Sequence, residues 1–238
     1  MRRHPRRGEA GREVSAPAPA PTERSAELGR RIGVPLVHGF YRPRVLGAWK
    51  VPARGPLIFA VNHSHFVDGP MLLGASPRPV HFLIKKEMFG GPLGSFLDAI
   101  GQLSVDRDSV DRAAITRALG VLDNGGVLGI FPEGTRGEGD FSSLRAGLAY
   151  FAVRSGAPIV PVAVLGSAEG RSRLIPAWPP LRSRIDLVFG EPFEAQEASG
   201  GPGPARGRRT RKALDEATVR IQERLAAHLE NARRLTGR

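Results

Sequence analysis

A histidine and an aspartate follow a short apolar run of the chain, with four residues between them. The run is Leu57–Val61, and the two residues are His63 and Asp68. An imidazole that titrates near neutral pH can take a proton from a hydroxyl group, and a carboxylate can fix its tautomer and stabilise the imidazolium. The pair therefore predicts acid–base catalysis with His63 as the general base. A structural role stays open, because Asp68 before Gly69 and Pro70 also suits the N-terminus of a helix.

A second group of candidate residues carries positive charge. Arg107 and Arg136 each come just after a predicted strand, and Lys85 ends another. Guanidinium groups match phosphate oxygens through two parallel hydrogen bonds. We therefore expect Arg107 and Arg136 to form a phosphate clamp, to which Lys85 adds a third positive charge. Surface arginines are numerous in this chain, so what distinguishes Arg136 is the sequence before it.

That sequence is Glu133-Gly134-Thr135, and each of its residues suits a binding site. Glu133 can orient an arginine or a hydroxyl group, Gly134 allows close approach of the backbone, and Thr135 offers a small hydrogen-bond donor. The three residues follow a second apolar run, 127–131. Ligands of open α/β sheets bind where strands end, so we expect the ends of the two runs to face one site.

Other kinds of catalytic site have little support. The chain has no cysteine, which excludes disulfides, thiolate metal ligands and an acyl-cysteine intermediate. His63 and His65 could share a metal ion, but the other histidines form no cluster with ligand spacing, so we expect no metal. The Gly-x-Ser-x-Gly pentad and the glycine-rich nucleotide-binding motifs are absent. We expect no cofactor either.

The charge of the chain calls for an anionic partner. The formal net charge is +12, and the isoelectric point is about 11.3. Nucleic acid, an acidic membrane surface and a phosphorylated substrate would all satisfy it. Aromatic residues make up only 6% of the chain and are not interleaved with the basic runs, as they would be in proteins that bind single strands. Zinc-finger spacing is also absent, so no nucleic acid is expected.

Membrane contact is expected to be peripheral, at the cytoplasmic face. No apolar stretch approaches the roughly 20 residues that cross a bilayer. Residues 1–24 are rich in arginine, alanine and proline, a composition that predicts a disordered basic tail. Residues 25–44 form an amphipathic segment, which could lie in a membrane interface with its arginines at anionic headgroups. A helix packed on its own domain explains the same pattern.

The rest of the chain predicts a single α/β domain. Apolar strand-like runs alternate with amphipathic helical segments between residues 45 and 199. This alternation is typical of a mostly parallel mixed sheet with helices on both faces, an αβα sandwich. Residues 200–209 read as a flexible linker, and 210–238 as a charged C-terminal helix.

Four segments, taken in order, resemble the four sequence blocks of the glycerolipid acyltransferase family, and most nearly its 1-acyl-glycerol-3-phosphate acyltransferase branch. The segments are residues 62–68, 101–107, 131–136 and 157–162. The resemblance covers about residues 45–193. The His-x₄-Asp spacing is weak alone, whereas Phe-Pro-Glu-Gly-Thr-Arg at this distance behind it is specific.

The resemblance implies transfer of a fatty acyl chain to the free hydroxyl of a lysophospholipid. The acyl donor would be a coenzyme A or acyl-carrier-protein thioester, used as a co-substrate without metal or covalent intermediate. In this family's pattern His63 would be the general base and Asp68 its partner. The phosphate of the acceptor would be held by residues of the second and third blocks, namely Arg107, Glu133, Gly134, Thr135 and Arg136.

Two departures from the family pattern bear on the acceptor. His65 stands where serine is usual, and Ser104 stands where bulkier apolar residues are common. The main expectation is synthesis of phosphatidic acid from lysophosphatidic acid. Two alternatives stay open: acylation of another lysolipid or glycolipid, and a non-catalytic basic protein that binds lipid or nucleic acid.

Overall fold

The computed structural model describes residues 19–134, 139–142, 144–169, 178–196 and 211–238. In this part of the chain seven strands form one sheet, in the order β1-β7-β6-β2-β5-β3-β4. The strands are β1 (Arg42–Leu46), β2 (Leu57–Val61), β3 (His81–Lys85), β4 (Leu103–Val105), β5 (Val127–Ile130), β6 (Ile159–Leu165) and β7 (Arg184–Phe189). Strands β2 to β6 run parallel, while β7 pairs with β6 in the antiparallel sense and with β1 in parallel. The expected mixed, mostly parallel sheet is confirmed.

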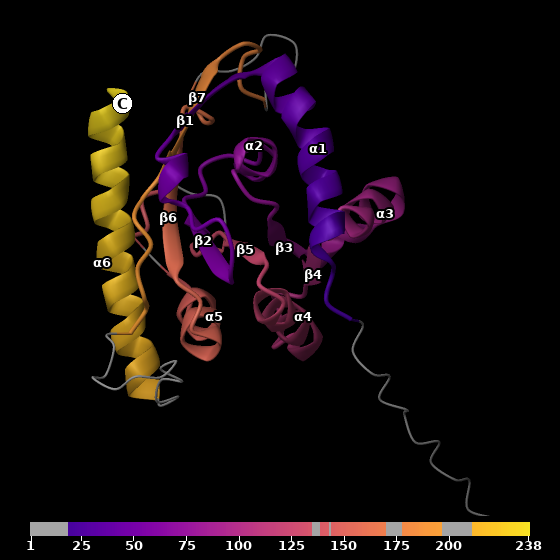
Figure 1. Cartoon of the computed structure of the whole chain (residues 1–238), viewed down its shortest axis with the longest axis vertical. Coiled ribbons are helices and arrows are strands. Elements are labelled where there is room, and N and C mark those ends of the chain that lie inside the picture. The colour runs from indigo at the N-terminus through magenta and orange to yellow at the C-terminus, as the bar shows by residue number, and fades with distance from the viewer. Residues whose placement is uncertain (1–18, 135–138, 143, 170–177, 197–210) are drawn as a thin grey trace, which may run out of the picture.

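Helices cover both faces of this sheet (Figure 1). The longer helices are α1 (Glu23–Phe40), α2 (Asp68–Ala75), α3 (Gly91–Ala99), α4 (Arg112–Asp123), α5 (Gly147–Ser155) and α6 (Arg211–Thr236), and two short 3₁₀ turns are η1 (Ala48–Lys50) and η2 (Lys86–Phe89). Helices α4, α5 and α6 lie on one face, and α1, α2 and α3 lie on the other (Figure 1). The αβα sandwich predicted from the sequence is therefore present.

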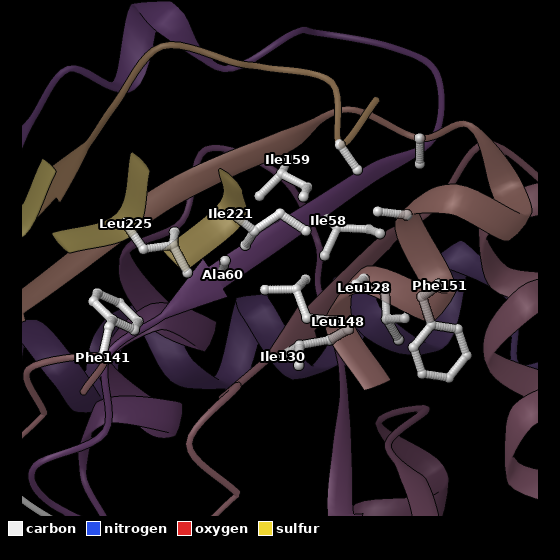
Figure 2. Close-up of a cluster of buried hydrophobic side chains, with 14 of the residues drawn as sticks. Ile58, Ala60, Leu128, Ile130, Phe141, Leu148, Phe151, Ile159, Ile221 and Leu225 are labelled. Atoms are coloured by element: carbon white, nitrogen blue, oxygen red, sulfur yellow. The ribbon is translucent and has the colours of Figure 1, made fainter. Parts of the chain in front are cut away.

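Each face of the sheet has its own apolar core. Strands β2 and β6 are buried at every position, as expected for parallel strands covered on both sides. Figure 2 shows the core under α5 and α6, where side chains of the central strands meet both helices. Its labelled members are Ile58, Ala60, Leu128, Ile130, Phe141, Leu148, Phe151, Ile159, Ile221 and Leu225. The C-terminal helix is thus part of the domain core and not an appendage.

The N-terminal segment differs in detail from the expectation. Helix α1 contains Pro35 and runs through it to Phe40. The sheet then begins at Arg42, inside the segment expected to precede the domain. Helix α1 packs closely on α2, because an ideal Cβ at Gly33 would lie 3.1 Å from the Cα of Gly74. No helix in the described ranges combines the length and apolar character needed to cross a bilayer.

The sheet direction brings the predicted site residues to one edge. His63 follows β2, Lys85 ends β3, Arg107 follows β4 and Glu133 follows β5. Because these strands run parallel, all four residues lie at the carboxyl ends, where open α/β sheets bind ligands. Strands β2 and β5 are direct neighbours, so His63 and Glu133 lie closest to one another in the strand order.

A buried asparagine fixes the end of β2 against β6. The side chain of Asn62 donates to the carbonyl of Val164 at 3.1 Å and accepts from the amide of Val164 at 2.7 Å. Only 2% of Asn62 is exposed. The side chain therefore continues the strand ladder by one step beyond Val61, and it sets the position from which the loop with His63 departs.

Replacing this side chain should destabilise the fold. Asn62→Leu keeps the approximate volume but leaves two buried backbone groups of Val164 without partners, which should lower the free energy of unfolding by about 2–4 kcal/mol. Urea denaturation measures the change. Asn231→Leu, at an exposed position of α6, is the matched control and should change stability little. Equal stability of the Asn62→Leu and wild-type proteins would contradict the ladder role.

Two covered histidines make the fold sensitive to acid. Burial lowers the pKa of His81 and of His228 below the ordinary value of 6.5, and each ring bonds a backbone carbonyl, of Gly101 and Val188 respectively. At these two histidines, the unfolded chain therefore binds protons more readily than the folded protein does. Stability should therefore be complete above pH 6.5 and fall as the pH drops below that value.

Thermal unfolding across this pH range tests the prediction. The His228→Gln variant keeps a donor for the Val188 carbonyl but does not titrate, so its melting temperature should fall less steeply with acidification. His38→Gln, at an exposed position of α1, should keep the wild-type slope. A melting temperature that does not respond to pH below 6.5 in the wild-type protein would refute the assignment.

Candidate active site

The imidazole of His63 is held by a carboxylate that three donors share. His63 Nδ1 lies 3.2 Å from Asp68 Oδ2, and the same oxygen accepts the backbone N–H groups of Ser64 at 2.9 Å and His65 at 2.7 Å. Asp68 is fully buried. Although Asp68 is the first residue of α2, its carboxylate turns back to the loop. The orienting role is thus the one that its contacts support, and with Nδ1 bound to the carboxylate, Nε2 is the nitrogen of His63 that remains available to a ligand.

Aromatic rings fix the other side of the imidazole. The ring of Phe131 lies 4.2 Å from that of His63, with 30° between their planes, and it stacks on Phe82 at 5.6 Å. The His63 side chain is 17% exposed. The imidazole is therefore held between a carboxylate and an apolar ring, and one edge stays accessible to a substrate.

Glu133 contacts the backbone near the dyad. Burial raises the pKa of its carboxyl group, and hydrogen bonds from the backbone amides of His63 and Phe141 partly oppose this shift. These bonds tie the end of β5 to the His63 loop and to the segment 139–142. The described contacts of Glu133 thus position the backbone of His63, whereas the sequence suggested that it orients a ligand group.

An open cavity of about 410 Å³ adjoins the dyad. It lies at the carboxyl ends of β3, β4 and β5, between the N-terminal parts of α4 and α5. Its walls are mostly apolar, and its polar members include Arg107 and Arg145. Phe131 lines the cavity and also contacts His63. A single aromatic ring therefore separates the cavity from the imidazole.

The side chains of Arg107 and Arg145 both contact Gly134. Arg107 Nη1 donates to the carbonyl of Gly134, and a Cβ at Gly134 would overlap the side chain of Arg145. Gly134 also has a φ of 73°, which favours glycine. The arginine after β4 and the arginine before α5 therefore both lie against one residue of the third sequence block.

Sequence reasoning missed Arg145. It stands two residues before α5, and its backbone N–H bonds the carbonyl of Pro132 at 2.8 Å. A basic residue near a helix N-terminus is electrostatically unfavourable, so its place in the sequence carried a weak indication of another role. Nothing else in the sequence links it to Arg107.

One other predicted residue that the structure describes, Lys85, does not join this group. Lys85 is exposed, lies 3.6 Å from Glu87 and does not line the cavity. Thr135 and Arg136 lie outside the described residues. Among the described residues, no three histidine, aspartate or glutamate side chains come together as metal ligands would.

Sequence comparisons find a matching family model and related proteins. A sequence model of the acyltransferase family matches residues 42–165. The 1-acyl-sn-glycerol-3-phosphate acyltransferase of Bacillus subtilis is 29% identical over 184 residues, which cover 76% of this chain and 89% of the relative. The enzyme of the same name from Borreliella burgdorferi is 30% identical over 122 residues, 50% of this chain and 49% of the relative.

A solved structure shares the fold. The crystal structure of the 1-acyl-sn-glycerophosphate (LPA) acyltransferase PlsC from Thermotoga maritima superposes with a TM-score of 0.58 at 21% identity. The match covers 87% of this chain and 78% of the other. The family model spans more than half of the chain, including His63, Asp68, Arg107 and Gly134. The chain therefore belongs to the acyltransferase family, and it is an enzyme that transfers acyl groups other than amino-acyl groups.

Proposed function

We propose that this acyltransferase transfers a fatty acyl chain from a coenzyme A or acyl-carrier-protein thioester to the free hydroxyl of 1-acyl-glycerol-3-phosphate, giving phosphatidic acid. The observation that carries the proposal is the braced imidazole of His63 beside a cavity whose cations are Arg107 and Arg145. A lysophospholipid with a hydroxyl and a phosphate would use both. Both bacterial relatives are 1-acyl-sn-glycerol-3-phosphate acyltransferases, which supports this acceptor.

The reaction needs one base and no covalent intermediate. Nε2 of His63 takes the proton of the acceptor hydroxyl as its oxygen attacks the thioester carbonyl. An ester C–O bond forms, the C–S bond breaks, and the leaving thiolate receives the proton from the imidazolium. Asp68 Oδ2 stabilises the imidazolium between these steps.

The acceptor phosphate would lie on the cationic side of Phe131. Arg107 and Gly134 line the cavity there. We propose that Thr135 and Arg136, which follow Gly134 in the chain, complete the phosphate site, and that Lys85 adds positive charge at its margin. Glu133 would act indirectly, because its carboxylate fixes the backbone of His63 through a hydrogen bond.

Steady-state kinetics with a panel of acceptors tests this function. With acyl-CoA and a thiol indicator, release should require lysophosphatidic acid. His63→Ala should lower kcat by about 10²–10⁴, and Asp68→Asn should lower it by a similar factor, because the tautomer is no longer fixed. His38→Ala on α1 is the control. Release with a different lysolipid or a glycolipid alone would assign another acceptor, and lipid binding without release would refute catalysis.

We also propose that the enzyme acts at the anionic cytoplasmic surface of a membrane. Helix α1 buries Ala26, Gly29, Gly33 and Val37. Its exposed large apolar residues are Leu28, Leu36 and Phe40. Such side chains on a helix that already packs on α2 suit insertion between lipid headgroups. The exposed arginines of α1, Arg24 and Arg31, suit anionic lipids.

Helix α3 supports the same surface. It is mostly apolar, yet Gly94 is its one buried residue. Leu93 and Phe96 are 47% and 41% exposed, and Met88 in the preceding turn is 47% exposed. Helices α1 and α3 are close, since an ideal Cβ at Gly29 would lie 3.1 Å from the Cβ of Ile100. An apolar helix left uncovered beside a lipid-processing site is expected to meet lipid.

Vesicle binding tests this surface. The double change Leu93→Ser and Phe96→Ser should weaken binding to vesicles of equal parts phosphatidylglycerol and phosphatidylcholine by about tenfold, because two apolar side chains lose their lipid contact. Activity on short-chain, monomeric substrates should be kept. Val219→Ser, at a 56% exposed position of α6 on the opposite face, is the control. Unchanged vesicle binding by the double variant would refute the role of α3.

A further inference from the structure

Arg107 and Arg145 are two cations without a described counter-ion. Among the described residues, neither forms an ion pair with a carboxylate. The two acidic side chains of the same cavity wall, Asp106 and Asp111, are engaged elsewhere: Asp106 bonds Lys86 Nζ at 2.6 Å, and Asp111 bonds the amides of Asp106 and Ala114. The charge of Glu87 also acts on Arg107, but Glu87 lies 3.6 Å from the amine of Lys85. Within the described ranges, the two guanidinium groups therefore have no ion pair of their own.

The two guanidinium groups are held close to each other. Arg107 reaches Gly134 from the loop after β4, and the Arg145 side chain lies along Gly134 from the segment before α5. The pKa of Arg107 is lowered, first by burial and then by the positive charge of Arg145. Two cations that repel one another beside an apolar cavity raise the free energy of the empty site, and a bound anion relieves this cost.

We propose that Arg107 and Arg145 form one clamp for the doubly charged phosphate of a phosphate monoester. The clamp makes the enzyme prefer lysophosphatidic acid to lysolipids whose phosphate is a diester. This inference rests on the proposed function and names a binding residue for it, Arg145, that the sequence pattern did not indicate.

The charge of the ligand explains the preference. A phosphate monoester carries about −1.5 to −2 near neutral pH and offers three terminal oxygens. A phosphodiester carries one negative charge and has two such oxygens. With two guanidinium groups at the site, the second charge and the third oxygen gain additional charge-assisted hydrogen bonds. A diester can satisfy one guanidinium fully but leaves the other poorly compensated.

The structure also limits competing ligands. Leu83, Val105, Ile115, Ile130, Leu148 and Phe151 are among the other lining residues, and they offer no hydrogen bonds to a sugar or a base. Besides the arginines, the polar lining side chains are Asp106, Ser109 and Asp111, and the two carboxylates already bond groups of the protein. The phosphate end of the ligand would therefore make most of the polar contacts. An alkyl or glyceryl portion can lie against the apolar walls and Phe131, next to the imidazole of His63.

Kinetics with two acceptors that differ in phosphate charge test the clamp. Arg145→Gln should raise the KM for lysophosphatidic acid by about 10- to 100-fold, the cost of losing charged hydrogen bonds, with little change in kcat. The KM for lysophosphatidylglycerol, a diester, should rise by much less. Arg145→Lys should restore part of the preference, because it returns the charge without the fork.

Arg154→Gln is the matched control. Arg154 is exposed, lies near the other end of α5 and does not line the cavity, so this change should leave both KM values unaltered. Equal effects of Arg145→Gln on monoester and diester, or an unchanged KM for lysophosphatidic acid, would overturn the clamp.

A binding measurement separates this inference from the proposed reaction. Calorimetric titration of the His63→Ala protein with hexanoyl lysophosphatidic acid should show binding that Arg145→Gln weakens by a similar factor. If Arg145→Gln weakens binding but the wild-type protein shows no turnover, the clamp is supported and the reaction is refuted. If the wild-type protein turns over lysophosphatidic acid but Arg145→Gln does not change the binding affinity, the reaction is supported and the clamp is refuted.

Discussion

The fully buried carboxylate of Asp68 is the interaction on which the site depends. A carboxylate removed from water costs several kcal/mol unless donors surround it. Here one oxygen receives two backbone amides and the imidazole of His63. Both amides come from the loop that joins β2 to α2, so the loop closes around the first residue of its own helix. The geometry of the His63–Asp68 pair is therefore set largely within six consecutive residues, 63–68.

That loop is useful only because both ends are fixed. Asn62 extends the ladder between β2 and β6 on one side, and α2 is held under α1 by the close approach of Gly33 and Gly74 on the other. Glu133 then ties the loop to the end of β5 through the backbone of His63. Three independent contacts thus hold one imidazole, as a site that must place a proton acceptor precisely relative to a substrate requires.

The strands and helices were predictable, while several contacts of the site were not. Buried parallel strands produce continuous apolar runs, so β2, β5 and β6 could be placed from composition alone. Asn62 and Val164 lie 102 residues apart, and no periodicity links them. Asp111 caps α4 by accepting the amide of Ala114, and the sequence offered Asp108 and Ser109 as equally suitable caps within one turn. Arg145 was missed because its relation to Arg107 exists only through Gly134.

Phe131 lies between the His63–Asp68 pair and the cavity that holds Arg107 and Arg145. The carboxylates of Asp68 and Glu133 lie on the imidazole side. The cavity side holds Arg107 and Arg145, together with Asp106 and Asp111, whose carboxylates bond Lys86 and backbone amides. If a guanidinium group paired with Asp68, the imidazolium would lose its partner, and the phosphate site would lose a cation. An aromatic ring that contacts His63 and lines the cavity keeps these functions apart without adding a hydrogen-bonding group of its own. In the proposed reaction, the hydroxyl of a small headgroup would meet the imidazole of His63 while its phosphate meets the two arginines on the other side of Phe131.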